Sequence, residues 1–248
     1  AGGDAPALSD PADTAALFAE TRPDRVFLAA GKSGGIAANT RYPADLILDN
    51  LRVACNVIHA AHAAGVDKLL YLASSCAYPR DCPQPMRVAS LMTGPLEPTN
   101  DAYATAKLAG IKLCQAFRQQ YGDNFVAAIP ANLFGPGDDF SRDDSHVIGA
   151  LIRRMHEAKM RGDAAVTCWG TGRARREFLY ADDAADACLF VMDRYDEAAP
   201  INLGGGADLS IRELAEAVRA VVGFKGEVAF DATQPDGMPL KALDSSAL

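Results

Sequence analysis

The chain contains 248 residues, of which 49% are hydrophobic and 23% charged, and its formal net charge is −8 at pH 7. This length suffices for one large domain or slightly more, with a sizeable buried core. No apolar run approaches the ~18 consecutive residues of a membrane span, and the negative charge argues against nucleic acid as a partner. An anionic substrate would therefore have to be held by local arginines.

Four short apolar runs, each bounded by turn residues, predict buried strands at 25–30, 68–73, 125–129 and 166–169. Apolar residues recur with helical spacing over 44–64, 102–121, 147–160, 182–192 and 211–222. Strands that alternate with helices indicate βαβ units, so we predict an α/β fold with a parallel sheet buried on both faces. After Gly135 a polar loop over 138–144 marks the expected start of a substrate-binding region.

Capping residues support these helix boundaries. Thr99, Asn100 and Asp101 offer an N-cap to the helix over 102–121, and Gly65 and Gly122 follow two helices where a C-cap glycine belongs.

Six cysteines lie scattered along the chain without a CxxC pair. Such spacing is typical of reduced thiols, so we expect a soluble enzyme of the cytoplasm.

Tyr103 and Lys107 form the most informative pair in the chain. They stand four residues apart in a predicted helix and therefore share one face. The ammonium is expected to lower the pKa of the phenol, and Ser74, at the end of a predicted strand, could bond to the same substrate oxygen. This arrangement can donate a proton to a carbonyl under reduction, and it needs a hydride carrier beside it.

Five arginines flank the polar loop and are candidates to hold an anion, namely Arg153, Arg154, Arg173, Arg175 and Arg176. Any one of them is more typical of solvated surface charge. Cys76 and His146 lie near the expected site, yet each alone is also more typical of a structural residue.

Three patterns imitate other functions. Gly31, Lys32 and Ser33 resemble the end of a phosphate-binding P-loop, but Val26 stands where its first glycine is required, so we do not expect a nucleotide triphosphatase. The glycines at 204–206 lack the third glycine of a GxGxxG pattern, which would fall on Leu209, and are more typical of a tight turn.

Cys55, His59 and His62 recur at helical spacing and could present metal ligands. A fourth ligand and supporting groups are not visible in the sequence, so we favour an ordinary helix and predict no metal site.

The most specific motifs are Ser74-Ser75-Cys76, the tetrapeptide SHVI that contains His146, and the segment GGI at 34–36. The pair Tyr103 and Lys107 within YATAKLAG marks only the superfamily. Further motifs lie at 29–36, 58–62, 97–100, 132–136, 169–179 and 230–237. Together they resemble GDP-L-fucose synthases, which are extended short-chain dehydrogenases/reductases that act on nucleotide sugars. The similarity runs over essentially the whole chain.

The resemblance implies a Rossmann-like doubly wound fold and two reactions on GDP-4-keto-6-deoxy-D-mannose: epimerisation at C3 and C5, then reduction at C4 by NADPH to give GDP-L-fucose. It implies the catalytic set Ser74, Cys76, Tyr103, Lys107 and His146. Cys76 and His146 match the acid/base positions, and a thiol and an imidazole both titrate near neutral pH. Tyr103 would protonate the C4 oxygen, which Ser74 would steady.

The resemblance also implies the residues that bind the two ligands. Those for NADP(H) are Leu72, Ala73, Ser74, Ser75, Tyr103, Lys107, Pro130, Ala131, Asn132, Leu133 and His146. Those for the GDP part of the substrate are Arg154, Trp169, Arg176 and Lys241. Leu240 departs from the family, which often has a second basic residue there.

The domain division implied is 1–135 for an NADP-binding Rossmann domain, with return segments near 176–205, and 136–248 for a substrate-binding region. The family's first strand, glycine-rich turn and helix, about thirty residues, have no counterpart in the 248 residues, and neither has its final helical segment. We expect the natural protein to have them, because a sheet without its central strand would expose a long apolar edge.

Two alternatives stay open at this point. The chain could be a sister enzyme acting on another GDP-keto-sugar, of the colitose or heptose type, or a non-catalytic subunit that keeps the fold. A homodimer through the helices over 44–64 and 102–121 is the expectation that the family brings.

Overall fold

The computed structural model describes residues 7–141 and 145–248; part of the predicted polar loop over 138–144 thus lies outside the described residues. Four parallel strands form the central sheet in the order β1-β2-β3-β7. They are β1 (Arg25–Leu28), β2 (Lys68–Leu72), β3 (Phe125–Pro130) and β7 (Ile201–Leu203). Every residue of β3 and β7 is buried, as expected for strands covered on both faces.

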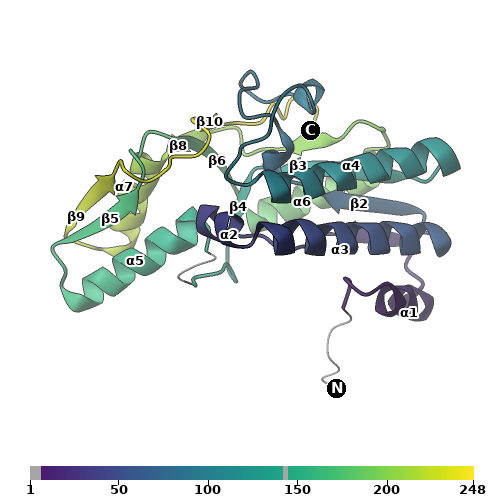
Figure 1. Cartoon of the computed structure of the whole chain (residues 1–248), viewed down its shortest axis with the longest axis horizontal. Coiled ribbons are helices and arrows are strands. Elements are labelled where there is room, and N and C mark those ends of the chain that lie inside the picture. The colour runs from purple at the N-terminus through teal and green to yellow at the C-terminus, as the bar shows by residue number, and fades with distance from the viewer. Residues whose placement is uncertain (1–6, 142–144) are drawn as a thin grey trace.

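Helices cover both faces of this sheet (Figure 1). On one face lie α3 (Pro43–Ala63) and α4 (Asp101–Tyr121), which pack along each other, and on the other lies α6 (Ala181–Arg194). The predicted C-cap is confirmed at Gly122, which adopts the left-handed conformation at φ 80° and closes α4. The doubly wound α/β fold predicted from the sequence is confirmed.

Strand β1 lies at one end of the central sheet. Within residues 7–141 and 145–248 it pairs with β2 alone, and Phe27 on this strand is 43% exposed.

A second group of elements lies beside the central sheet (Figure 1). In it, α5 (Val147–Arg161) and α7 (Ile211–Val222) pack together against the parallel pair of β5 (Ala165–Trp169) and β9 (Glu227–Asp231). Their side chains form a hydrophobic cluster separate from that of the central sheet. The molecule thus has two cores, and a cleft can open between them.

A third, small sheet joins the two cores. Its strands are β4 (Asn132–Phe134), β6 (Arg175–Tyr180), β8 (Asp208–Ser210) and β10 (Leu240–Lys241). The spacing of apolar residues did not predict these strands, nor α1 (Pro11–Thr21), α2 (Ile36–Arg41) and the 3₁₀ turns η1 (Ser75–Ala77) and η2 (Val88–Ser90). Most are too short to show a clear hydrophobic period.

Close packing of α4 on β2 depends on Gly110. A Cβ atom at this position would lie 2.3 Å from Cζ of the buried Tyr71 ring, so the helix could not keep its distance from the strand. We expect Gly110→Ala to lower the free energy of unfolding by about 1–3 kcal/mol, as overpacking does. Urea denaturation measures this, and Lys112→Ala, exposed on the same helix, is the control. Equal stability of the two variants would contradict the packing argument.

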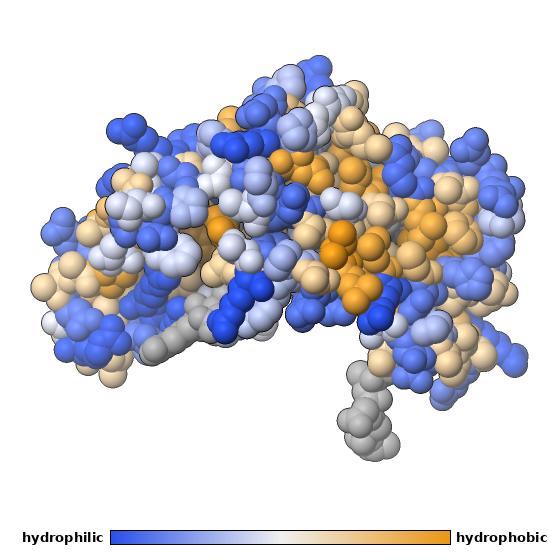
Figure 2. All heavy atoms as spheres, viewed as in Figure 1, coloured by the Kyte–Doolittle hydropathy of each residue, from blue (hydrophilic) through white to orange (hydrophobic). Residues whose placement is uncertain are grey.

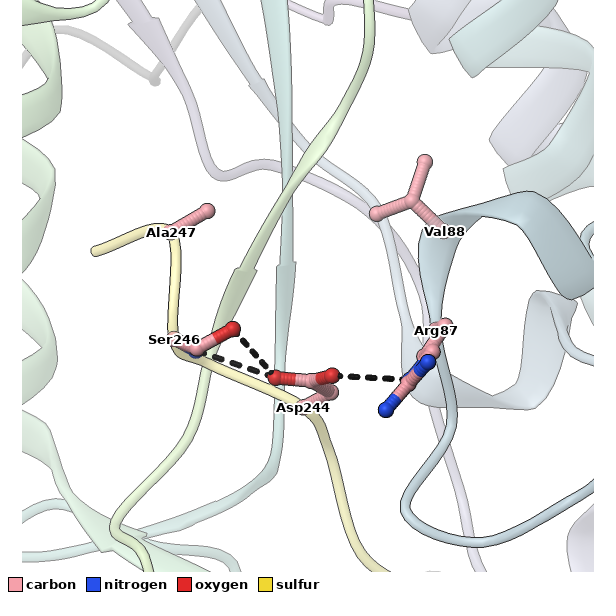
Figure 3. Close-up of a pocket in the computed structure, with 5 residues that line it drawn as sticks. All are labelled: Arg87, Val88, Asp244, Ser246 and Ala247. Atoms are coloured by element: carbon pink, nitrogen blue, oxygen red, sulfur yellow. Dashed lines mark hydrogen bonds and ion pairs between the residues drawn. The ribbon is translucent and has the colours of Figure 1, made fainter.

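A second, shallow pocket lies near the C-terminal end of the chain (Figure 3). It is lined by Val88, Ala247 and the surface ion pair of Arg87 and Asp244, whose Nε and Oδ2 are 3.1 Å apart. Across the described residues, no helix is both long and apolar enough to cross a bilayer.

Candidate active site

A cleft of about 680 Å³ opens at the carboxyl ends of β2 and β3, between the two cores. This is where ligands bind in open parallel sheets. All the residues that the resemblance assigned to catalysis, cofactor binding or substrate binding line it. They are Leu72, Ala73, Ser74, Ser75, Cys76, Tyr103, Lys107, Pro130, Ala131, Asn132, Leu133, His146, Arg154, Trp169, Arg176 and Lys241.

Ser74 and Cys76 are presented by the turn that follows β2. The Ser74 hydroxyl accepts a hydrogen bond from the Cys76 backbone amide at 3.2 Å and so caps the 3₁₀ turn η1. The same hydroxyl is hydrogen-bonded to the Tyr103 phenol and to the Cys76 thiol. One serine therefore joins the strand end to helix α4.

Lys107 lies one turn after Tyr103 on α4, as predicted, and its ammonium donates to the Leu72 carbonyl at 3.0 Å. Its Nζ stands 5.9 Å from the centre of the Tyr103 ring. Burial lowers the pKa of Lys107 to about 8, against the opposing effect of the Cys76 charge. The ammonium is thus turned toward the strand end.

The predicted lowering of the Tyr103 pKa is wrong for this geometry. Burial raises that pKa above its ordinary value, the charge of Cys76 raises it further, and the hydrogen bond with Ser74 only partly opposes them. Tyr103 is consequently a protonated phenol at neutral pH. That is the form required of a proton donor.

Lys107 is a buried cation with no carboxylate partner within the described ranges. We expect Lys107→Met to raise the free energy of unfolding at pH 7 by about 1–2 kcal/mol, because the desolvation cost exceeds the lost hydrogen bond. The gain should shrink as pH rises from about 8 toward 10, where the folded wild type loses this proton and the unfolded chain keeps it. Urea denaturation measures both, with Lys112→Met as control; a less stable variant at pH 7 would refute it.

Cys76 has two nitrogen donors at its sulfur. Asn100 Nδ2 lies 3.2 Å from Sγ and Lys241 Nζ lies 3.3 Å from it. The predicted N-cap is therefore only half right: Asn100 occupies the N-cap position of α4, but its side chain makes no capping bond. Lys241 was predicted to bind the GDP part of a substrate, and its ammonium contacts the Cys76 thiol. Its contact with a substrate stays a prediction.

His146 occupies the N-cap position of α5 and is exposed on the wall of the cleft. It comes from the second core, whereas the other four predicted catalytic residues come from the first. The position of His146 relative to Cys76 thus depends on how the two cores meet.

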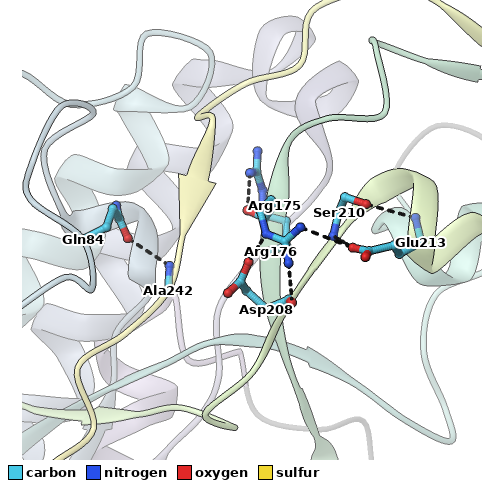
Figure 4. Close-up of polar contacts among 7 residues, drawn as sticks. All are labelled: Gln84, Arg175, Arg176, Asp208, Ser210, Glu213 and Ala242. Carbon is cyan, nitrogen blue, oxygen red and sulfur yellow. Dashed lines mark hydrogen bonds and ion pairs between the residues drawn. The ribbon is translucent and has the colours of Figure 1, made fainter.

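The structure separates the five candidate arginines into those that line the cleft and those that do not. Arg154 and Arg176 line the cleft, whereas Arg153, Arg173 and Arg175 do not. Arg175 donates to the Asp208 carboxylate and to Glu213 Oε2, the latter at 3.3 Å, which joins β6 to the start of α7 (Figure 4). Arg153 donates to the Phe140 carbonyl at 2.8 Å. Only two of the five arginines are therefore placed to meet an anion in the cleft.

The structure also shows the place of the segment that resembles the end of a P-loop. Gly31 and Ser33 line the cleft, and a Cβ atom at Gly31 would lie 2.6 Å from Asn50 Oδ1. Asn50 Nδ2 donates to the Lys32 carbonyl at 2.8 Å and fastens this segment to α3. The segment is a wall of the cleft held by a helix.

The remaining patterns are structural as well. His62 Nδ1 is 2.7 Å from Asp123 Oδ2, while Cys55 and His59 are exposed on α3. The glycines at 204–206 follow β7, and Gly206, at φ 79°, donates its amide to the buried Glu177 carboxylate at 2.7 Å. They form the turn that was expected.

Sequence reasoning did not assign a ligand-binding role to three polar side chains in the cleft. Asn39 and Asn100 each have a buried Oδ1 with no hydrogen-bond partner in the described parts of the chain. The buried Oε2 of Glu97 makes no hydrogen bond there either, but it is ion-paired with Arg80, 3.6 Å from its Nε. Unpaired buried acceptors are rare in proteins. They suit the hydroxyl groups of a sugar or a ribose, so the cleft fits a nucleotide and a sugar.

A parallel sheet with helices on both faces, and a serine, a tyrosine and a lysine converging at its carboxyl edge, defines the class of short-chain dehydrogenases/reductases. A family model described as the NAD dependent epimerase/dehydratase family matches residues 6–204. GDP-L-fucose synthase 1 of Arabidopsis thaliana is 52% identical over 241 residues, which are 97% of this chain and 75% of that protein.

Two solved structures are similar to the whole fold. A GDP-6-OMe-4-keto-L-xylo-heptose reductase from C. jejuni superposes with a TM-score of 0.90 at 33% identity, over 96% of this chain and 80% of that one. A GDP-L-fucose synthetase from Naegleria fowleri bound to NADP gives 0.88 at 29% identity, over 97% and 74%. The chain therefore belongs to the NAD dependent epimerase/dehydratase family, within its GDP-L-fucose synthase branch, and the resemblance seen in the sequence is confirmed.

Proposed function

We propose that this chain is an NADP-dependent epimerase and reductase that converts GDP-4-keto-6-deoxy-D-mannose to GDP-L-fucose. The observation that carries the proposal is that Ser74, Cys76, Tyr103, Lys107 and His146 line one cleft. The similarity to GDP-L-fucose synthase 1 of Arabidopsis thaliana, at 52% identity, supports it.

NADPH, when bound, supplies the hydride that reduces the C4 ketone. Tyr103, Lys107 and His146 would hold its nicotinamide end, together with the strand ends at 72–75 and 130–133. The orphaned acceptors in the cleft and the cationic Lys107 suit its ribose. The Naegleria structure with NADP supports this choice of cofactor.

Epimerisation requires a proton to leave C3 or C5 on one face of the ring and to return on the other. The C4 ketone acidifies both hydrogens, because the electron pair left behind forms an enolate. Cys76 and His146 would carry out the two transfers, and they come from two different elements, η1 and the start of α5. Ser74 and Tyr103, hydrogen-bonded to each other, would stabilise the enolate oxygen as an oxyanion hole does.

Reduction then needs a proton at the C4 oxygen. Tyr103 holds that proton at neutral pH, because burial raises the pKa of its phenol. Ser74 would keep the oxygen beside it, and Lys107 would stabilise the phenolate that remains. These roles follow from the order of groups along α4 and η1.

Arg154 and Arg176 are proposed to bind the pyrophosphate of GDP, with Trp169 against a flat or sugar surface. Trp169 is 48% exposed at the end of β5, where a packing role in the core would bury it. We further propose 1–135, with 176–205, as the cofactor part, and 136–248 as the substrate part.

The test is turnover in D₂O. The protein is incubated with GDP-4-keto-6-deoxymannose and NADPH while NADPH absorbance is followed, and the product is examined by NMR for deuterium at C3 and C5. Both signals are expected. Absence of NADPH oxidation together with absence of deuterium at either carbon would refute the assignment.

A second candidate is a sister enzyme on another GDP-keto-sugar, of the heptose or colitose type, which the similarity to the C. jejuni heptose reductase favours. Parallel assays with the corresponding keto-sugars separate the two. A non-catalytic subunit is the remaining alternative, and tight NADPH binding in a fluorescence titration would eliminate it.

We also propose a homodimer through α3 and α4, in the cytoplasm. Apolar side chains gather over these helices on the face shown in Figure 2, and Leu48 and Tyr121 are 46% and 53% exposed. Light scattering at several protein concentrations tests the dimer.

A further inference from the structure

Lys241 is a buried cation whose partner is a thiol. The residue is 8% exposed, and its Nζ lies 3.3 Å from Cys76 Sγ. No carboxylate of the described residues lies within ion-pair distance of it. A buried ammonium is costly unless an anion or several acceptors face it. In this site the group able to become that anion is the sulfur of Cys76.

The backbone holds Lys241 in place from both sides. Strand β10 pairs in parallel with β6, with Lys241 opposite Arg176. Gln84 then bonds to each neighbour of Lys241. Its Nε2 donates to the Leu240 carbonyl at 3.1 Å. Its Oε1 accepts from the Ala242 amide at 3.1 Å (Figure 4). The lysine is thus fixed at Cys76 by its strand and by a side chain from another loop.

Asn100 supplies the second donor to the sulfur, at 3.2 Å from Nδ2. An asparagine at an N-cap position ordinarily accepts from the first amides of its helix. Here the side chain makes no such bond and points an N–H at the sulfur. A thiolate accepts from two donors better than a thiol does, since it has more negative charge and no proton of its own.

Charged and titratable groups face this sulfur from three elements. Lys241 comes from β10, Arg176 from β6, and Tyr103 and Lys107 from α4. The two acids nearby, Glu97 and Asp236, act on Arg176. The balance at the sulfur is therefore positive, because the phenol is neutral.

We propose that Lys241 and Asn100 are positioning residues that hold Cys76 as a thiolate in the substrate-free protein. The catalytic consequence rests on the proposed function: Cys76 would start as the proton acceptor. The substrate C–H bond would break, its proton would form S–H on Cys76, and its electron pair would enter the enolate.

The electrostatics agree with the geometry. Burial by itself raises the pKa of Cys76, but the Lys241 ammonium, the Ser74 hydroxyl and Arg176 outweigh it, so the pKa lies below that of an ordinary thiol. Burial raises the pKa values of the buried thiols of Cys82, Cys114 and Cys188. It also raises that of Cys168, where the charge of Arg154 opposes burial but does not outweigh it.

The test is the rate of iodoacetamide alkylation of the whole chain against pH, read at each cysteine by peptide mass spectrometry. Cys76 should titrate below the ordinary thiol value of about 8.5. Lys241→Met should raise its midpoint by about one pH unit or more, which is a roughly tenfold loss of rate at pH values below the wild-type midpoint. Lys241→Arg should keep most of the lowering, and Asn100→Ala should give a smaller rise.

Two controls isolate the effect. Lys225→Met removes the same charge from an exposed position and should leave Cys76 unchanged, and Cys55, exposed on α3, should alkylate alike in all variants. A wild-type Cys76 that titrates at or above an ordinary thiol would overturn the proposal even if Lys241→Met failed to fold. An unshifted midpoint in folded Lys241→Met would also overturn it.

The titration needs no substrate, so it separates this proposal from the proposed function. If Cys76 titrates low and shifts in Lys241→Met, but the wild type exchanges no deuterium at C3 and C5, the thiolate stands and the assigned reaction fails. If exchange occurs, the acidic limb of its pH–rate profile in Lys241→Met should move to higher pH by the same interval as the thiol midpoint. An acidic limb that does not move would show that the Cys76 thiolate is not the proton acceptor.

Discussion

Tyr103→Phe should lower the rate of C4 reduction about 10²- to 10⁴-fold, the usual range for loss of a general acid. The phenol is the group in the cleft that holds a proton through neutral pH, because burial raises its pKa, and it is hydrogen-bonded to Ser74. Deuterium exchange at C3 and C5 should persist in part, since Cys76 and His146 remain and Ser74 still faces the oxygen. NADPH oxidation and NMR measure the two steps separately.

Tyr121→Phe is the matched control. Tyr121 ends the same helix and is 53% exposed, outside the cleft. It should keep wild-type reduction. If Tyr103→Phe lost exchange as completely as reduction, the phenol would act in both steps and the division of roles proposed above would be wrong.

Cys76→Ser should lower exchange at C3 and C5 by about 10²- to 10⁴-fold. A serine hydroxyl fits the space of the thiol and can still bond to Asn100 and Lys241, but it does not ionise near neutral pH. The rate of reduction of a ketone that is already epimerised should fall much less, because Ser74, Tyr103 and Lys107 are untouched. Deuterium uptake followed by NMR, and NADPH oxidation with the epimerised ketone, measure the contrast.

Cys55→Ser is the control for this variant, as Cys55 is exposed on α3 and does not line the cleft. It should leave both rates unchanged. Equal losses of exchange and reduction in Cys76→Ser would contradict the assignment of Cys76 to epimerisation.

Long elements with a strong hydrophobic period could be predicted from the sequence. The helix expected over 102–121 is α4 (Asp101–Tyr121), and the strand expected over 68–73 is β2 (Lys68–Leu72). Strands of two or three residues, such as β10 and β7, have no period to detect and exist only because a neighbouring strand pairs with them.

The candidate site, too, could be predicted from the sequence only in part. Tyr103 and Lys107 could be paired from their spacing, since a helix brings i and i+4 to one face. Their protonation states could not be predicted from the sequence. The expectation that the pKa of Tyr103 is lowered did not take burial into account, and the Lys107 ammonium donates to the Leu72 carbonyl. Arg175 and Arg176 are adjacent in sequence, yet one joins β6 to α7 and the other lines the cleft.

By itself, the sequence determined the α/β class, the main helices and strands, and the kinds of side chain at the ends of the strands. These depend on local periodicity and on short spacings, which the chain carries wherever it folds. Only the tertiary structure decided that the Lys241 ammonium contacts Cys76, 165 residues earlier in the chain. It also decided that the Asn100 side chain donates to this sulfur and makes no capping bond, and that two of the five arginines line the cleft. Such contacts depend on the pairing of β10 with β6 and on the meeting of the two cores, and burial there sets which groups are charged.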